Sequence, residues 1–188
     1  MLASPEEFGA VLADPPWPFR DRGSRFSPDY EGQELADQSK YQVLTVADLC
    51  AMGWAVKHVA LADSFLFLWS PNALVLDGTA TRVARAWGFE PKQLIPWVKV
   101  TNDRKKPRIG GGHYTRVCTE QLVLCRRGKA KVLRRDIPGV IHAPRGNEHS
   151  RKPCECFGLI EKLVSGPYLE LFARRKFSSL WTAWGDEM

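Results

Sequence analysis

Short, continuous apolar runs alternate along this chain with segments that have the pattern of helices. The expected strands are Ala10–Ala13, Phe65–Trp69, Gln93–Val100, Glu120–Cys125, Val140–Ala143 and Tyr168–Ala173. Three helices are expected. The first is capped by Thr45, the second spans Leu74–Trp87 and is closed by Gly88, and the third spans Pro153–Val164 and has Pro in its first turn. Strands that alternate with helices predict an α/β fold whose mainly parallel sheet is covered on both faces. Ligands of such sheets bind at the carboxyl ends of the strands.

The first apolar run ends at Asp14-Pro15-Pro16-Trp17. This motif suits methyl transfer to an exocyclic base amine, which is a poor nucleophile because its lone pair is delocalised into the ring. The Asp14 carboxylate and the Pro15 carbonyl can accept hydrogen bonds from its two N–H groups, and the fixed φ of proline holds that carbonyl in place. We expect Trp17 to offer a flat face on which a base stacks. The alternative is a Pro-Pro turn with a Trp that belongs to the core.

The composition, with 44% hydrophobic and 26% charged residues, is ordinary for a soluble globular protein. We expect a single domain over residues 1–188, with no separate target-recognition domain, in the cytoplasm of a bacterium or of a phage-infected host. No apolar run has the length of a membrane span, and the N-terminus lacks the features of a signal peptide.

Positive charge is concentrated in one part of the chain. Residues 99–152 contain 15 Lys and Arg but 4 Asp and Glu, whereas the net charge of the whole sequence is +6. A basic segment of this kind predicts a polyanionic partner, nucleic acid first, although a merely solvated loop is the alternative.

The five cysteines have no regular spacing, and no paired C-x-x-C motif is present. Cys154 and Cys156, together with His142 and His149, could be imagined as a zinc site. Scattered reduced thiols are much commoner in an intracellular chain, so we expect no metal.

Several blocks occur in an order that resembles the MT-A family of adenine N6-methyltransferases. They are Val11-Leu12-Ala13-Asp14-Pro15-Pro16-Trp17, Phe67-Leu68-Trp69, Trp97-Val98-Lys99, Gly112-His113-Tyr114-Thr115-Arg116 with Glu120, Glu148-His149-Ser150-Arg151-Lys152-Pro153 before the helix that contains Ile160-Glu161-Lys162-Leu163, Leu169-Glu170-Leu171-Phe172-Ala173-Arg174 and Trp184-Gly185-Asp186-Glu187. The family includes the catalytic subunit of the eukaryotic mRNA methyltransferase and short bacterial and phage members. The resemblance implies a Rossmann-like class I methyltransferase fold, circularly permuted so that the catalytic motif precedes the cofactor-binding strand, and S-adenosylmethionine as methyl donor.

The resemblance also assigns roles to individual positions. Asp14 would hold the target amine and the donor's amino group, within a catalytic motif of Asp14, Pro15, Pro16 and Trp17. Lys152 would pair with the methionyl carboxylate, because a fixed cation suits that charge. The implied cofactor-binding residues are Asp14, Lys152, Glu170, Phe172, Arg174, Lys176, Asp186 and Glu187. Asp186 and Phe177 depart from the family, which usually has Asn at the first position and, in longer members, at the second.

Residues 18–40 and the basic segment 101–116 are the expected contacts with nucleic acid. The candidate substrate-binding residues are Lys40, Tyr41, Lys99, Arg104, Lys105, Lys106, Arg108, His113 and Arg116. Arg116 and Glu120 are four residues apart, so a simple ion pair between them is the alternative to a substrate role. Only 13 residues precede Asp14, so we expect another element to replace the upstream segment that helps to hold the cofactor's adenine in longer relatives; the alternative is a cofactor that binds more loosely.

These observations predict a methyltransferase that acts on adenine N6 of a flipped or unpaired base, in DNA rather than RNA. The DNA preference depends on the short architecture, and RNA stays the alternative. Two other interpretations remain open: a non-catalytic nucleic-acid-binding partner subunit, and a methyltransferase whose acceptor is cytosine N4 or a protein glutamine amide. A homodimer is a further expectation.

Overall fold

The computed structural model describes residues 7–18, 44–111, 114–146 and 151–185 of the chain. Its strands are β1 (Phe8–Ala13), β2 (Ala60–Ser70), β3 (Glu90–Val100), β4 (Thr119–Arg127), β5 (Ile141–Pro144), β6 (Tyr168–Leu171) and β7 (Trp181–Trp184). Its helices are α1 (Val46–Ala51), α2 (Gly53–Val59), α3 (Asn72–Leu76), α4 (Thr79–Ala86) and α5 (Glu155–Leu163). In these ranges no helix is long and apolar enough to cross a membrane.

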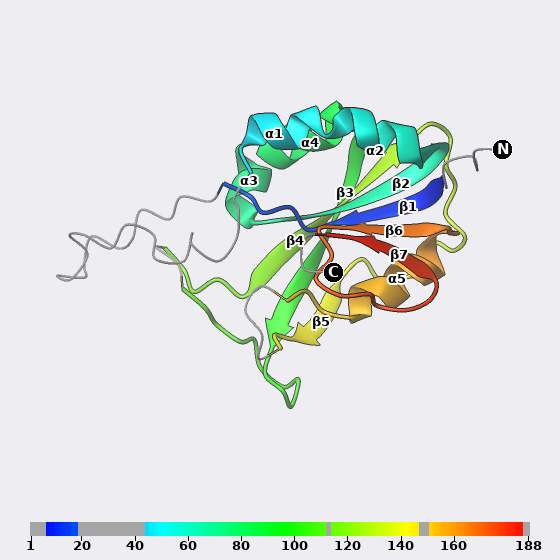
Figure 1. Ribbon diagram of the computed structural model, residues 1–188. Helices are drawn as coiled ribbons and strands as arrows, with labels where there is room; N and C mark the ends of the chain where they lie inside the picture. The colour runs from blue at the N-terminus through cyan, green and yellow to red at the C-terminus, as the bar shows by residue number, and fades with distance from the viewer. Residues whose placement is uncertain (1–6, 19–43, 112–113, 147–150, 186–188) are drawn as a thin grey trace.

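The strands form one twisted sheet in the order β5-β3-β4-β2-β1-β6-β7 (Figure 1). β4 pairs antiparallel with β2 and with β3, while every other pairing is parallel. The carboxyl ends of the parallel strands therefore share one edge of the sheet with the first residues of β4. We call this edge the carboxyl edge.

Helices cover both faces of the sheet. α1, α2, α3 and α4 lie on one face and α5 lies on the other (Figure 1). Because neighbouring residues of a strand point to opposite faces, each strand contributes to two cores. Val11 and Leu68 belong to the core under α1 and α4, whereas Leu12 and Trp69 belong to the core under α5. This arrangement confirms the predicted Rossmann-like α/β class, with β1 and its Asp14 before β6 in the chain.

Local sequence signals explain where the helices begin and end. Thr45 caps α1 in a capping box: its hydroxyl accepts a hydrogen bond from the Asp48 N–H, and the Asp48 carboxylate accepts one from the Thr45 N–H at 3.0 Å. Gly88 has a φ of 86° after α4. That left-handed conformation favours glycine and ends the helix as expected.

Two parts of the fold differ from the expectation. The helix predicted over Leu74–Trp87 is divided into α3 and α4 at Gly78, whose φ of 80° is incompatible with a continuous helix. β7 was not predicted, because only Trp181 among its four residues is fully buried. It pairs parallel with β6 and extends the sheet by one strand.

Candidate active site

The two-residue alternation of the strands brings the charged side chains of the site to one face. Side chains two residues apart on a strand point to the same face of the sheet. Asp14 therefore shares the face of Leu12, and Glu170 shares the face of Tyr168, which is the face that α5 covers. Asp14 also follows the last residue of β1, so it lies at the carboxyl edge. A pocket opens there, lined by Leu12, Asp14, Trp69, Arg151, Lys152, Cys154, Phe157, Glu170, Phe172, Arg174, Arg175 and Phe177. We call it the carboxyl-edge pocket.

Four alternating charges form a chain across this edge. Lys152 Nζ lies 2.7 Å from Asp14 Oδ2 and 3.5 Å from Glu120 Oε2. The other oxygen of Glu120, Oε1, accepts a hydrogen bond from Lys99 Nζ at 2.5 Å. Both lysine side chains are mostly buried, with 17% of Lys152 and 16% of Lys99 exposed. Two ammonium groups thus balance two carboxylates, which is the condition under which buried charges are tolerated.

The pKa values follow from burial and from these pairs. Burial raises the pKa of Asp14 above its usual value, although the Lys152 ammonium opposes this shift. Burial alone would lower the pKa of Lys152, but the charges of Asp14 and Glu120 outweigh it and raise the pKa. Burial would likewise raise the pKa of Glu120, and the two lysines reverse this effect and lower it.

Glu170 differs from Asp14, the other acid that lines the pocket. Its Oε2 is buried and has no hydrogen-bond partner in the part of the chain that the structure describes. Burial, together with the nearby charge of Asp14, raises the pKa of Glu170 to about 7. The buried Nε1 of Trp69 also has no partner among the described residues. The carboxyl-edge pocket therefore contains one unsatisfied acid oxygen and one unsatisfied N–H donor, the kind of exception that a bound polar ligand explains.

The Asp-Pro-Pro-Trp motif forms a tight turn after β1. The Trp17 N–H donates to the Pro15 carbonyl at 2.8 Å, and the Leu44 N–H donates to the Pro16 carbonyl at 3.2 Å. A carbonyl oxygen has two lone pairs, so the Pro15 carbonyl keeps acceptor capacity for a ligand.

Trp17 does not present the stacking face that the sequence suggested. Its side chain is 8% exposed and packs in the core under α1 and α4 with Leu49 and Leu68. The indole Nε1 donates a 2.8 Å hydrogen bond to the Trp69 carbonyl at the end of β2. Trp17 is not among the residues that line the pocket, and its buried indole satisfies a main-chain acceptor. The expectation of an exposed stacking surface is corrected on these grounds, and the core interpretation holds.

Residues that follow β6 line one side of the carboxyl-edge pocket. Phe172 has a φ of 61°, unusual for a residue with a side chain, and it lines the pocket together with Arg174. Arg175 lines the pocket as well, whereas the exposed Lys176 is not among the lining residues. The Phe177 ring stacks on Phe157 with 3.9 Å between ring centroids. The other two predicted cofactor residues, Asp186 and Glu187, lie outside the described residues.

The predicted substrate-binding residues fall into three groups. Lys40, Tyr41 and His113 lie outside the described residues. Lys99 belongs to the chain of charges described above. The exposed residues on the connection from β3 to β4 are Arg104, Lys105, Lys106, Arg108 and Arg116.

Internal contacts hold part of this connection in place. Arg104 pairs with Glu155 of α5 at 2.8 Å, and Arg108 donates to the Arg145 carbonyl at 3.3 Å. Glu120 contacts Lys99 and Lys152, so the simple pair with Arg116 that the spacing allowed is not the arrangement that forms.

The sequence did not predict the contacts that Glu120 and Trp69 make in the site. Glu120 joins the two lysines because β4 is antiparallel and begins at the edge where its neighbours end. Trp69 lies under the Lys152 ammonium, with 5.8 Å between Nζ and the ring centroid. In the sequence, the one indication that Glu120 belongs to the site is its place as a polar residue at the start of an apolar strand. No group of three or more His, Cys, Asp or Glu side chains that could hold a metal ion occurs among residues 7–18, 44–111, 114–146 and 151–185.

Comparison with known proteins agrees with this geometry. The family model described as MT-A70 matches residues 8–187. The human N(6)-adenosine-methyltransferase catalytic subunit METTL3 is 25% identical over 97% of this chain and 28% of its own length. The N(6)-adenosine-methyltransferase MT-A70-like protein of Arabidopsis thaliana is 28% identical over 96% of this chain and 24% of its own length.

A third relative is the N6-methyladenosine RNA methyltransferase MTA1 of Pyricularia oryzae, which is 23% identical over 100% of this chain and 49% of its own length. The chain thus spans between about a quarter and a half of the relatives it matches. Since the family model covers nearly every residue, from β1 through the carboxyl-edge pocket to the end of β7, the chain belongs to the MT-A70 family of methyltransferases.

Proposed function

We propose that this chain transfers a methyl group from S-adenosylmethionine to the N6 amine of adenine in nucleic acid. The observation that carries the proposal is the position of Asp14 at the carboxyl edge, where it pairs with Lys152 in the lining of a pocket that contains unsatisfied polar groups. The names of the relatives support adenine as the target, because METTL3 and its Arabidopsis relative are named N(6)-adenosine-methyltransferases.

The motif can activate an aromatic amine by accepting its protons. The Asp14 carboxylate accepts one N–H, and the second lone pair of the Pro15 carbonyl accepts the other. Two acceptors on one side turn the nitrogen lone pair out of the ring plane, toward the electrophile. No strong base is required, since the proton leaves after the nitrogen has been methylated. Lys152 counteracts the effect of burial on Asp14 and so favours the carboxylate form that accepts the hydrogen bond.

The residues of the carboxyl-edge pocket fit S-adenosylmethionine. When bound, this cofactor supplies a methyl group on a sulfonium centre, ready for in-line transfer. The unsatisfied Glu170 Oε2 is an acceptor for hydroxyl groups such as those of a ribose, and the Trp69 Nε1 is a donor for a cofactor oxygen or nitrogen. Lys152 and Arg174 are cations suited to a carboxylate, and the stacked Phe157 and Phe177 offer apolar surface.

The nucleic-acid substrate is supported by charge and by the relatives. The exposed Arg104, Lys105, Lys106, Arg108 and Arg116 lie on the connection that leaves the carboxyl edge next to Lys99. Exposed cations beside an active site favour a phosphate backbone. DNA is the substrate that we propose first and RNA is the alternative, since one relative is named an RNA methyltransferase, so both polymers belong in the test.

The test measures transfer of a labelled methyl group to unmethylated duplex DNA, single-stranded DNA and RNA side by side. Digestion of the product to nucleosides identifies the methylated position and separates adenine N6 from cytosine N4. Asp14→Ala should abolish transfer, whereas Asp136→Ala, which removes an exposed carboxylate paired with Arg134, should leave it unchanged. Binding of S-adenosylmethionine without transfer to any of the three polymers would refute the proposal and favour a non-catalytic partner subunit.

A further inference from the structure

A second pocket lies at the edge of the sheet opposite the carboxyl edge. It has a volume of about 380 Å³ and is formed where α4 leads into β3 and where β4 ends. Its lining residues are Arg85, Gly88, Phe89, Glu90, Lys92, Arg126, Arg127 and Gly128. Since β4 spans nine residues and a strand rises about 3.3 Å per residue, this pocket lies on the order of 25 Å from Glu120. We call it the basic pocket.

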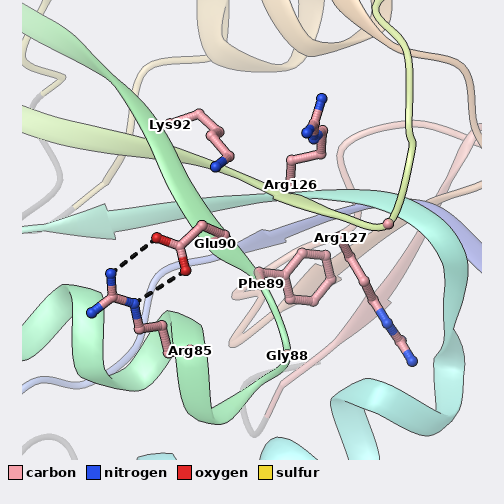
Figure 2. Close-up of a pocket in the computed structure, with 8 residues that line it drawn as sticks. Arg85, Gly88, Phe89, Glu90, Lys92, Arg126 and Arg127 are labelled. Atoms are coloured by element: carbon pink, nitrogen blue, oxygen red, sulfur yellow. Dashed lines mark hydrogen bonds and ion pairs between the residues drawn. The ribbon is translucent and has the colours of Figure 1, made fainter.

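Four cationic side chains and one carboxylate line the basic pocket. Figure 2 shows the carboxylate, Glu90, facing Arg85 of α4, which donates to it through Nε at 3.2 Å and through the terminal guanidinium nitrogen at 2.9 Å. This bidentate pair neutralises Glu90. The Arg127 guanidinium reaches the other way and donates to the main-chain carbonyls of Lys57 and Ala60 at 2.9 and 3.0 Å. The Arg127 charge is therefore partly compensated by two main-chain carbonyl groups.

Lys92 and Arg126 supply the excess positive charge. Both are exposed, and Figure 2 shows their side chains on the same side of the β3–β4 pair. The main chain of Arg126 pairs with β2 and β3, and its side chain forms no hydrogen bond or ion pair within the described parts of the chain. Lys92 is the extra residue of a β-bulge, because the pairing of β3 with β4 shifts between Pro91 and Gln93. Bulges are a common means of redirecting a side chain at the edge of a sheet, and Lys92 lines the pocket together with Arg126.

The turn that follows β4 continues the positive charge. Gly128 has a φ of 60°, and a Cβ there would lie 2.4 Å from the Ala62 carbonyl oxygen, so the position requires glycine. The nearby Asp63 carboxylate accepts a 2.7 Å hydrogen bond from the Lys129 N–H, which engages this acid with the main chain. The cations that follow are Lys129, Lys131, Arg134 and Arg135, and the acid among them is Asp136.

We infer that the basic pocket binds a phosphate group of the nucleic-acid backbone at a distance from the methylated base. The occupant follows from charge complementarity, since the pocket is concave, carries uncompensated cations and continues into a basic segment. The inference rests on the proposed function for its choice of nucleic acid. A strand engaged at both edges must span on the order of 25 Å, or about eight base pairs at 3.4 Å each. Shorter substrates reach the carboxyl edge alone.

The test compares a pocket variant with a control that has the same change in charge. The pocket variant is Lys92→Glu/Arg126→Glu, and the control is Arg82→Glu/Lys162→Glu, at two exposed positions of α4 and α5 outside both pockets. Fluorescence anisotropy with a strand of about 30 nucleotides and no methyl donor measures binding, as single strand and as duplex. The pocket variant should bind about tenfold more weakly than the control and should show a shallower dependence of log Kd on log salt, by about two phosphate contacts. Arg126→Gln, a milder change, should show a smaller loss in the same direction.

Equal losses in the pocket variant and the control would overturn the inference. So would binding of inorganic phosphate to the pocket combined with unchanged binding of the long strand, since this result would assign the pocket to a small anion. Methyl transfer supplies an independent readout: KM should rise for the strand of about 30 nucleotides and stay constant for one of about 6. If the wild-type protein methylates nothing, the proposed function fails, whereas the anisotropy result still decides the inference.

Discussion

The Lys152 ammonium lies 2.7 Å from the Asp14 carboxylate, although 138 residues separate the two in sequence. Asp14 directly follows the first strand of the sheet and Lys152 precedes the last helix. Their contact therefore requires the completed sheet, and it joins the catalytic motif to the wall of the carboxyl-edge pocket. Loss of either charge should therefore lower the stability of the fold as well as change the site.

Lys152→Met should destabilise the protein by about 1–3 kcal/mol, because it leaves the carboxylates of Asp14 and Glu120 close together without the shared cation. Asp14→Asn combined with Lys152→Met should cost less than the sum of the two single changes, since the double variant removes both partners of one pair. Urea unfolding measures these free energies. Lys162→Met, at an exposed position of α5, is the control and should change stability by less than about 0.5 kcal/mol. Strict additivity would show that the pair is not coupled.

Glu170 should make the stability depend on pH. Its pKa is about 7 in the folded protein, against an ordinary value of 4.5, so the folded protein retains a proton that the unfolded chain releases. Stability should therefore fall as the pH rises from 4.5 to about 7, and this contribution should stay constant above that range.

The side chain in Glu170→Gln cannot ionise, so this variant should not lose stability in this way as the pH rises. The variant should be more stable than wild type at about pH 8.5 and close to it at about pH 5, as measured by thermal unfolding in the two buffers. Glu155→Gln, which removes the acid paired with Arg104, is the control for the loss of a surface carboxylate. An equal difference between Glu170→Gln and wild type at both pH values would contradict the assignment of the raised pKa to Glu170.

Two glycines should respond to alanine in opposite ways. A Cβ at Gly185, just after β7, would lie 2.1 Å from the Ala173 carbonyl oxygen, so Gly185→Ala must displace the chain that carries Arg174. Gly158 lies within α5 and has open space around the position of a Cβ, so Gly158→Ala should stabilise the helix by about 0.5–1 kcal/mol. Unfolding midpoints should therefore move in opposite directions. A neutral Gly185→Ala would show that the contact between β7 and Ala173 relaxes freely.

The sequence predicted the central strands because each has a short continuous apolar run, which is typical of a strand in a sheet covered on both faces. It did not predict β7, since a strand of four residues with a single fully buried Trp has no distinctive pattern. The break at Gly78 was missed for a related reason. The residues on both sides of Gly78 favour a helix, and the hydrogen bond from the Thr79 N–H to the Asp77 carboxylate that starts α4 is visible only in the folded chain.

For the site, Asp14 and Lys152 were identified by their motifs, and the structure brings them into contact. Glu120 was considered as a partner of Arg116 because spacing along the chain is all that a sequence shows. Its contacts with Lys99 and Lys152 depend on the antiparallel direction of β4. Trp17 illustrates the same limit, because the motif gave its residue type while the turn at Pro15 decided which way the indole points.

Trp17 permits a direct separation of a structural role from a stacking role. Trp17→Phe keeps an aromatic ring but removes the Nε1 donor, which leaves the Trp69 carbonyl without that partner and should cost about 1–2 kcal/mol. Trp17→Ala should cost about 3–5 kcal/mol, because it empties a volume within the core under α1 and α4. Trp54→Phe, at an indole that is 77% exposed, is the control and should be neutral within about 0.5 kcal/mol. At a temperature where every variant is folded, the KM of Trp17→Phe for nucleic acid should equal that of wild type. An increased KM with unchanged unfolding free energy would instead mean that the indole turns toward the substrate and stacks on the base.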